Sequence, residues 1–292
     1  MGTGNRVPRD SQHRAVAIGE AVDAAWHRAH SAGRLDVPLS VVAALALLRQ
    51  HDSNGPDPAE QLRGLTTDDF FGLVRQVWTE VANARPDLVT ALYPLIAWCF
   101  DEPDRQVRAA AHATATAAMK AGQLEVTGTD ARHEVDVLGV VLALLKSRSA
   151  KGARGQFYTP APLVEAAARF LTPDEGQTVS DPAVGTGGLF RAVAGALRAT
   201  GRDPTTVTWA GCDVDELAVA AAAVNSLLWN LGPRVLLYAG DVLAEPDWIA
   251  HARAQRAEIL HLTDTVRRDK QLLIALDRLT DPCEEVGQQP TE

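Results

Sequence analysis

The sequence predicts an α/β fold in which an all-helical N-terminal segment is followed by a parallel sheet. Two observations lead to this fold class. Apolar residues recur at helical spacing across residues 13–147, and after residue 176 short apolar runs alternate with helical stretches. Strands that alternate with helices are typical of βαβ units, in which consecutive strands run parallel. We therefore expect the second half of the chain to form a doubly wound sheet.

The predicted helices of the first half start and stop at recognisable residues. Residues 1–12 are expected to be disordered, and residues 13–150 to form a helical domain. Thr66 and the acidic residues after it are typical of a helix start, Pro94 interrupts a helix, and Gly122 ends one. The predicted helices cover residues 14–30, 38–51, 66–84, 85–100, 103–122 and 130–148.

The second half is predicted to form a ligand-binding domain over residues 151–250. Three short apolar runs there are read as strands, and the longer Ala-rich stretches between them as helices. The strands are expected within residues 177–185, 206–215 and 234–243, with helices within 187–201 and 216–232.

The composition is that of a folded globular protein. Of the 292 residues, 46% are hydrophobic and 22% are charged, which suits one large domain or two modest ones. The net charge is −9. A protein that grips DNA alone needs an excess of Lys and Arg to neutralise phosphates. The overall charge therefore disfavours unaided DNA binding, and a local basic face and a helper subunit are the two alternatives.

The Cys and His residues indicate neither a disulfide framework nor a metal centre. The three cysteines are widely separated, and the eight histidines form no pair with ligand spacing. The polar N-terminus lacks the apolar core of a signal peptide, and no stretch approaches the roughly 18 apolar residues of a membrane span. We expect a cytoplasmic protein that binds no metal and no membrane.

Each predicted strand ends in residues suited to a ligand, and parallel sheets bind ligands beyond the carboxyl ends of their strands. After the first strand, Gly185 and Gly187 allow tight turns and a close approach of the ligand to the backbone. Asp213 ends the second strand and can accept hydrogen bonds from a ribose diol. Asp241 follows the third strand, where it can meet an adenine edge. This trio predicts a nucleoside ligand.

Other ligands fit the Gly-rich loop less well. No Gly-Lys-Ser or Gly-Lys-Thr follows it, which disfavours a P-loop, and the glycine spacing differs from that of dinucleotide-binding folds. Glycines and acids at strand ends also make turns and cap helices without any ligand. Three adjacent strand ends in the right order make that interpretation the weaker one.

Four motifs in order give the chain a family resemblance. They are GQFYTP from residue 155, DPAVGTGGLF from residue 181, GCDVDELAVAAAAVNSLLWNLG from residue 211 and GDVL from residue 240. Together they resemble N-6 adenine DNA methyltransferases, and most closely the modification subunit of type I restriction-modification systems. The resemblance covers about residues 130–245. It implies a partial Rossmann-like, S-adenosylmethionine-dependent methyltransferase fold beside the N-terminal helical domain.

The resemblance also implies roles for individual residues around S-adenosylmethionine. Phe157 would pack on the adenine, and Thr159 would meet the methionine portion. Asp213 would hold the ribose hydroxyls, and Asp241 the adenine amino group. Asp181, Gly185 and Gly187 would surround the methionine portion. The remaining motif positions assigned to the cofactor site are Tyr158, Ala183 and Thr186.

The family's catalytic motif, Asn-Pro-Pro-Phe or Asn-Pro-Pro-Tyr, is absent, because the sequence contains no Pro-Pro. In the family, its Asn side chain and Pro carbonyl accept hydrogen bonds from the target adenine's amino group, and its aromatic ring stacks on the flipped base. We therefore assign no catalytic residue.

The segment after the third strand resembles a helix rather than the strand that carries this motif. Residues 251–292 are predicted to be an amphipathic helix and tail, expected to cover the sheet edge that the missing strands leave open. A partner-binding helix is one alternative, and a remnant fourth strand at residues 259–262 is another. The apolar residues follow the 3/4 spacing of a coiled coil, interrupted by Asp269. They are Ile259, Leu262, Val266, Leu273 and Leu276.

Three hypotheses remain open on these patterns. The first is a site-specific DNA adenine N-6 methyltransferase that another polypeptide completes. The second is a non-catalytic S-adenosylmethionine-binding regulatory or interaction protein, and the third is a structural relative that binds no cofactor. DNA binding is expected only with a partner, either a specificity subunit or a second methylase subunit. A basic cluster could contact DNA phosphates or be a solvated linker. It consists of Lys146, Arg148, Lys151 and Arg154.

Overall fold

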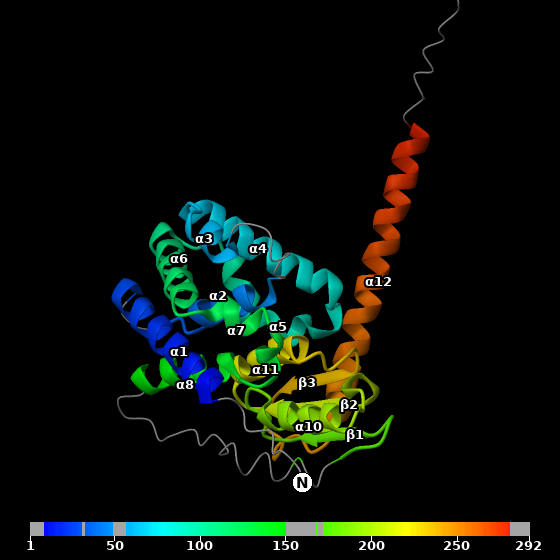
Figure 1. The fold of residues 1–292 in the computed structure, drawn as a ribbon. Coiled ribbons are helices and arrows are strands. Elements are labelled where there is room, and N and C mark those ends of the chain that lie inside the picture. The colour runs from blue at the N-terminus through cyan, green and yellow to red at the C-terminus, as the bar shows by residue number, and fades with distance from the viewer. Residues whose placement is uncertain (1–8, 31–32, 49–56, 150–167, 169–171, 281–292) are drawn as a thin grey trace, which may run out of the picture.

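The computed structural model describes residues 9–30, 33–48, 57–149, 168 and 172–280. In the described residues before 150, the regular elements are all helical (Figure 1). They are α1 (Arg9–His30), α2 (Asp36–Leu47), α3 (Pro58–Arg63), α4 (Thr67–Ala84), η1 (Pro86–Leu88), α5 (Val89–Ile96), η2 (Ala97–Cys99), α6 (Arg105–Lys120), α7 (Gln123–Thr127), η3 (Asp130–His133) and α8 (Val137–Ser149).

The described residues after 171 alternate between strand and helix, as the periodicity predicted. They form β1 (Thr178–Asp181), α10 (Gly188–Ala199), η4 (Pro204–Thr206), β2 (Thr208–Asp213), α11 (Glu216–Leu228), β3 (Val235–Ala239) and α12 (Trp248–Thr280).

Side-chain caps explain where two of the long helices begin. The Thr66 hydroxyl accepts a hydrogen bond from the Asp69 amide at the start of α4 (3.2 Å), and Asp104 accepts one from Val107 at the start of α6 (2.8 Å). Pro94 lies inside α5, which is flanked on both sides by short 3-10 turns. The helix predicted over residues 85–100 is therefore interrupted by these turns and not at Pro94, because α5 continues through this proline to Ile96.

Two predicted boundaries are wrong. α1 begins at Arg9, so residues 9–12 are helical and not disordered. The helix predicted over 130–148 is divided into the short turn η3 and α8. Asp136 explains the later start of α8, because its Oδ1 accepts the Gly139 amide (2.7 Å) and caps the helix there. α8 therefore begins at Val137, seven residues after the predicted start at residue 130.

The three described strands form a parallel sheet in the order β1-β2-β3. Trp209 of β2 pairs with Val179 of β1 and with Val235 of β3, so these three side chains share one face. α10 and α11 cover that face, with the Phe190 ring 5.3 Å from the Trp209 ring. Because the strands are parallel, their carboxyl ends meet at one edge of the sheet.

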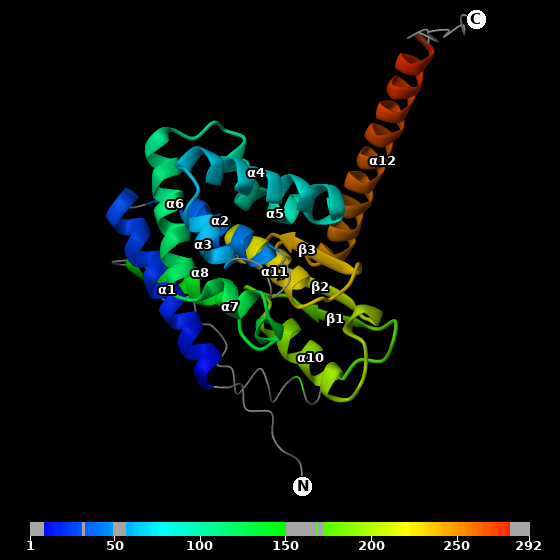
Figure 2. The same ribbon diagram turned by 45° about the horizontal axis from the view of Figure 1, so that its top comes forward.

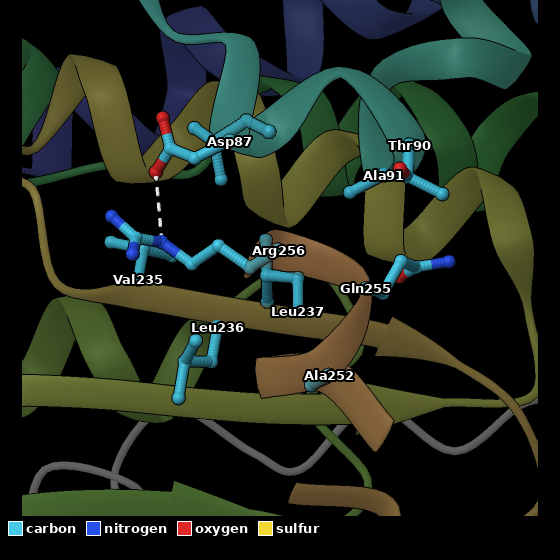
Figure 3. A pocket seen from close by; sticks show the side chains of 10 residues that line it. Asp87, Thr90, Ala91, Val235, Leu236, Leu237, Ala252, Gln255 and Arg256 are labelled. Carbon is cyan, nitrogen blue, oxygen red and sulfur yellow. Dashed lines mark ion pairs between the residues drawn. The ribbon is translucent and has the colours of Figure 1, made fainter. Parts of the chain in front are cut away.

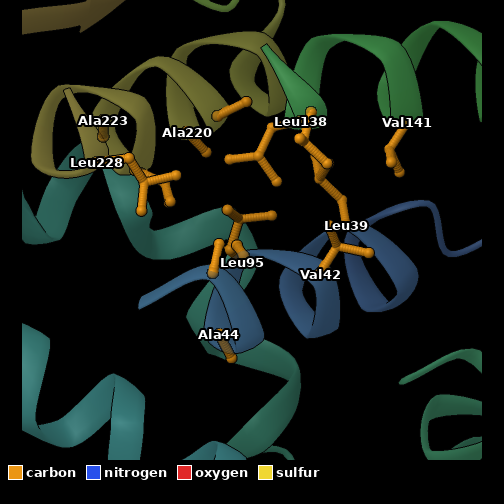
Figure 4. Close-up of a cluster of buried hydrophobic side chains, with 14 of the residues drawn as sticks. Leu39, Val42, Ala44, Leu95, Leu138, Val141, Ala220, Ala223 and Leu228 are labelled. Atoms are coloured by element: carbon orange, nitrogen blue, oxygen red, sulfur yellow. The ribbon is translucent and has the colours of Figure 1, made fainter. Parts of the chain in front are cut away.

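The helical segment and the sheet segment share one hydrophobic core. α11 lies between the N-terminal helices and the sheet (Figures 1 and 2). Figure 4 shows Leu228 of α11, Leu95 of α5, Leu39 of α2 and Leu138 of α8 in one buried cluster. This continuous burial places the N-terminal helices directly on the back of the helix that joins β2 to β3.

The first turns of α12 cover the other face of the sheet. Trp248 and Ala252 are buried in a second cluster with Ala210, Cys212 and Leu236 of β2 and β3. The expectation of a helix in this segment is confirmed, but the expectation that it covers an open sheet edge is wrong, because α12 packs on a face of the sheet. The alternative of a remnant fourth strand at residues 259–262 is also wrong, since those residues are helical.

The middle of α12 is fastened to the N-terminal helices. Figure 3 shows the Arg256 guanidinium beside the Asp87 carboxylate, 3.4 Å apart, at the joint between η1, β3 and α12. Arg267 donates to the Asn83 carbonyl at the end of α4 (2.9 Å). The pocket at the joint has a volume of about 10 Å³, which holds little more than one water. It is a packing gap and not a ligand site.

No helix within the described ranges combines the length and the apolar character needed to cross a bilayer.

Candidate functional site

The loop between β1 and α10 has the backbone that its glycines predict. Gly185 and Gly187 have φ angles of 53° and 95°, in the left-handed region that disfavours other residues. A Cβ on Gly187 would lie 3.0 Å from the Trp229 ring, whereas one on Gly185 would meet nothing within 4 Å. The Val184 amide donates to the Cys212 carbonyl (2.8 Å), which ties the loop to the end of β2. Open space therefore lies beside Gly185.

Asp213 is the point at which the three strand ends meet. Its Oδ2 accepts the Gly185 amide from the loop after β1 (2.8 Å), and its Oδ1 accepts the Asp215 amide (3.0 Å). Its own carbonyl accepts the Gly240 amide after β3 (2.9 Å). The side chain is only half-buried. A carboxylate has about four acceptor positions, so two remain available to hydroxyl donors of a ligand.

Asp181 lies beside this carboxylate at the end of β1. Its Oδ1 accepts the Ala183 amide (3.1 Å). Burial raises the pKa of Asp181 above its ordinary value, and the negative charge of Asp213 adds to the rise, while the hydrogen bond from Ala183 opposes it. The two carboxylates therefore repel each other electrostatically, and a ligand with donor groups or positive charge would relieve this repulsion.

Asp241 lies in an exposed turn after β3. Its Oδ1 accepts the Leu243 amide (2.9 Å), and its carbonyl accepts the Glu245 amide (2.8 Å). The preceding residue must be small, because a Cβ on Gly240 would lie 2.5 Å from the Tyr238 ring. The second carboxylate oxygen of Asp241 has no hydrogen-bond donor within the described residues.

The structure brings together part of the predicted site. Asp181 and Ala183 share a hydrogen bond, as do Gly185 and Asp213. Gly240, the residue before Asp241, donates its amide to the Asp213 carbonyl and so holds the start of the Asp241 turn beside β2. The Thr186 hydroxyl points elsewhere, as described below. The predicted residues of the first motif, Phe157, Tyr158 and Thr159, lie outside the described residues.

A family model matches the segment that contains these strand ends. Residues 134–260 match the family model described as N-6 DNA Methylase. This part of the chain is therefore similar to N-6 DNA methylases. The matched segment starts before α8, includes all three strands and ends within α12.

One solved structure is similar over a longer range. It is the methyltransferase subunit of a type I restriction-modification system from Streptococcus thermophilus, at 17% sequence identity and a TM-score of 0.41. The alignment covers 80% of this chain and 60% of that one, so the chain spans about 60% of the length of that subunit.

Sequence reasoning missed a buried polar group at the start of the N-6 DNA methylase segment. Asp136 Oδ2 accepts the Thr186 hydroxyl (2.5 Å), and its Oδ1 accepts the Asn225 amide group (2.8 Å) as well as the Gly139 amide. Asn225 also donates to the Thr186 carbonyl (2.8 Å). Two signals were available: the Asp-x-x-Gly start of α8, and a lone Asn in the Ala-rich α11.

Lys146 has a different role from the one the basic cluster suggested. It lies in α8, and its ammonium forms an ion pair with the Asp215 carboxylate. The prediction of a solvated linker is therefore wrong for Lys146, and the phosphate contact stays a prediction. Arg148 is described only as part of the α8 backbone, and Lys151 and Arg154 lie outside the described residues.

Proposed function

We propose that the chain binds S-adenosylmethionine at the carboxyl ends of β1, β2 and β3, as the cofactor-binding part of an adenine N-6 DNA methyltransferase. The observation that carries the proposal is the Asp213 carboxylate, which is held by the Gly185 and Asp215 amides at the meeting point of the strands. The family match over residues 134–260 supports the reaction class.

The residues present fit this cofactor. A partial Rossmann-like arrangement is proposed, in which Asp213 accepts hydrogen bonds from both ribose hydroxyls and Asp241 accepts one from the adenine amino group. Asp181, with the backbone of Ala183, Gly185, Thr186 and Gly187, would surround the methionine portion, where a carboxylate suits the positive sulfonium and ammonium groups. The bound cofactor would supply the methyl group. Phe157, Tyr158 and Thr159 keep their proposed places beside the adenine and the methionine portion.

The base-binding half of the reaction is proposed to come from another polypeptide. After Asp241 the described chain turns directly into α12, without a further strand. The sequence has no Pro-Pro with which to hold the amino group of a target adenine. A specificity subunit or a second methylase subunit would supply those contacts and would bring the DNA. The proposed division of labour assigns residues 9–150 to a helical domain, 151–247 to the cofactor and 248–292 to a helix and tail.

Titration calorimetry with S-adenosylmethionine tests this function. We expect the Asp213→Asn variant, which removes one charge at constant shape, to weaken binding by about tenfold or more, or about 1.4 kcal/mol. Asp203→Asn is the matched control, because Asp203 accepts similar backbone and hydroxyl hydrogen bonds from Thr205 in a turn at the other end of β2. Equal affinity in the wild type and Asp213→Asn would remove the proposed site.

A second candidate, a non-catalytic binder of the same cofactor, is favoured by the continuation of the chain into α12. Methyl transfer from labelled S-adenosylmethionine to adenine in DNA separates the two. Transfer by the chain with a partner subunit supports the methyltransferase. Cofactor binding without transfer in any subunit mixture supports the binder.

A further inference from the structure

α8 is attached at its N-terminal end to the Gly-rich loop. Asp136, which caps α8, accepts the Thr186 hydroxyl from that loop, and Asn225 of α11 donates to Asp136 and to the Thr186 carbonyl. Thr186 and Asn225 are both buried. A buried polar side chain that loses its partner destabilises the fold, so these bonds confine the loop to one position.

α8 is attached at its C-terminal end to the loop after β2. Lys146 pairs with Asp215, and both side chains are largely shielded from solvent. Asp215 caps α11 by accepting the Leu217 amide (3.2 Å), and its own amide donates to Asp213 Oδ1. Lys146 therefore acts on Asp213 through a single intervening residue.

The fit at the first attachment leaves no room for adjustment. A Cβ on Gly139 would lie 2.3 Å from Asp136 Oδ2 and 2.7 Å from Thr186 Oγ1. Real side chains do not approach so closely, and the interior has few voids into which the loop could move. α8 and the Gly-rich loop are in direct contact at this point.

We propose that α8 is a strut that sets the distance between the two cofactor loops, with Asp136 and Lys146 as positioning residues. The inference rests on the proposed function for its cofactor, but the positions of the loops are set without it. Asp136 holds residues 183–188 through Thr186, and Lys146 holds residues 213–217 through Asp215. Each acts through another residue.

Two pairs of variants at positions 136 and 146 test whether the hydrogen bonds and the charge of these side chains position the cofactor loops. Asn at position 136 can still accept from Gly139 and Asn225 and can donate to Thr186, so Asp136→Asn is expected to bind S-adenosylmethionine within about threefold of the wild type. Asp136→Ala breaks all three bonds and is expected to weaken binding by about tenfold. Lys146→Met should weaken binding by about threefold to tenfold, and Lys146→Arg, which keeps the charge, should restore it.

Hydrogen exchange on the free protein gives a readout that does not depend on the cofactor. For Asp136→Ala we expect faster exchange in peptides covering 183–190, and for Lys146→Met in peptides covering 213–217, while α2 and α6 keep wild-type rates. A merely structural role would instead accelerate exchange across the whole core. Lys146→Met changes a partly exposed side chain and serves if Asp136→Ala does not fold.

The outcomes are distinct. Local loosening that the Asn and Arg variants reverse supports the strut. Unchanged exchange in both loops, or loosening spread equally over α2 and α6, overturns it. A wild-type chain that binds no S-adenosylmethionine refutes the proposed function and the cofactor part of the strut, while the exchange data still decide whether α8 positions the loops.

Discussion

At Gly139 a single hydrogen atom in place of a side chain lets α8 contact the Gly-rich loop. We expect Gly139→Ala to destabilise the protein by about 1–3 kcal/mol, because the new methyl group overlaps Asp136 and Thr186. The control is Gly195→Ala in the exposed face of α10, where a Cβ meets nothing within 4 Å. That variant should be stabilised by about 0.5–1 kcal/mol through helix propensity. Urea unfolding measures both, and similar values for the two variants would contradict the close contact.

Asp136 makes a second prediction at the scale of one residue. Burial raises its pKa above the ordinary aspartate value of about 4, while the hydrogen bonds from Thr186, Gly139 and Asn225 oppose the rise. The folded state therefore favours the protonated carboxyl. Its contribution to stability is fully present below about pH 4 and is lost as pH rises through the folded-state pKa.

Asp136→Asn cannot titrate, so the stability of this variant relative to the wild type should increase from pH 4 towards neutral pH and then level off. Urea unfolding free energies of both proteins at pH 4, 5.5 and 7.5 give the difference directly. A difference that is constant or that falls with pH would show that the raised pKa is wrong.

At the scale of the element, the two ends of α12 differ in burial. Its first turns are buried against the sheet, and its described residues from 266 to 274 are all exposed as it projects away from the body (Figures 1 and 2). Trp248 is 6% exposed and Leu273 is 66% exposed. We expect Trp248→Ala to destabilise the fold by about 3–5 kcal/mol. Leu273→Ala should change it by less than about 0.5 kcal/mol.

Thermal or urea unfolding of the two α12 variants tests this contrast at a protein concentration low enough to keep the wild type monodisperse. A large loss of stability in Leu273→Ala would mean that the projecting part of α12 is covered by something in solution. The exposed apolar residues of α12, Leu262, Val266 and Leu273, would then be the first place to search for the contact.

At the scale of the whole molecule, the shared core couples the helical segment to the sheet. Leu95 of α5 is 0% exposed and packs beside α11, whereas Tyr93 on the same helix is 63% exposed. We expect Leu95→Ala to lower stability by about 2–5 kcal/mol and Tyr93→Ala by less than about 0.5 kcal/mol.

The shared core also predicts which elements lose hydrogen-exchange protection in Leu95→Ala. Hydrogen-exchange protection in β2 should fall together with that in α2, because both belong to one cooperative unit. If β2 kept its wild-type protection while α2 lost it, the two segments would unfold separately, and a boundary near residue 150 would divide them thermodynamically.

The sequence by itself determined the elements and the chemistry of the strand ends. Helical spacing, caps such as Thr66 and Asp104, and the change of period after residue 176 are local signals, and local signals are sufficient to form helices and strands. The glycines at positions 185 and 187 are also a local signal, because they predict a left-handed backbone at these two residues. Local signals also placed Asp213 at the carboxyl end of its strand.

Only the tertiary structure decided which distant residues meet. Asp136 and Asn225 are 89 positions apart, and Lys146 and Asp215 are 69 apart. No periodicity encodes such pairs, because each side chain is compatible with many surroundings until the core brings α8, α11 and the Gly-rich loop together. The course of α12 is of the same kind. An amphipathic pattern says that one side of a helix will be buried, but the neighbours available in the folded chain decide what buries it and where the burial stops.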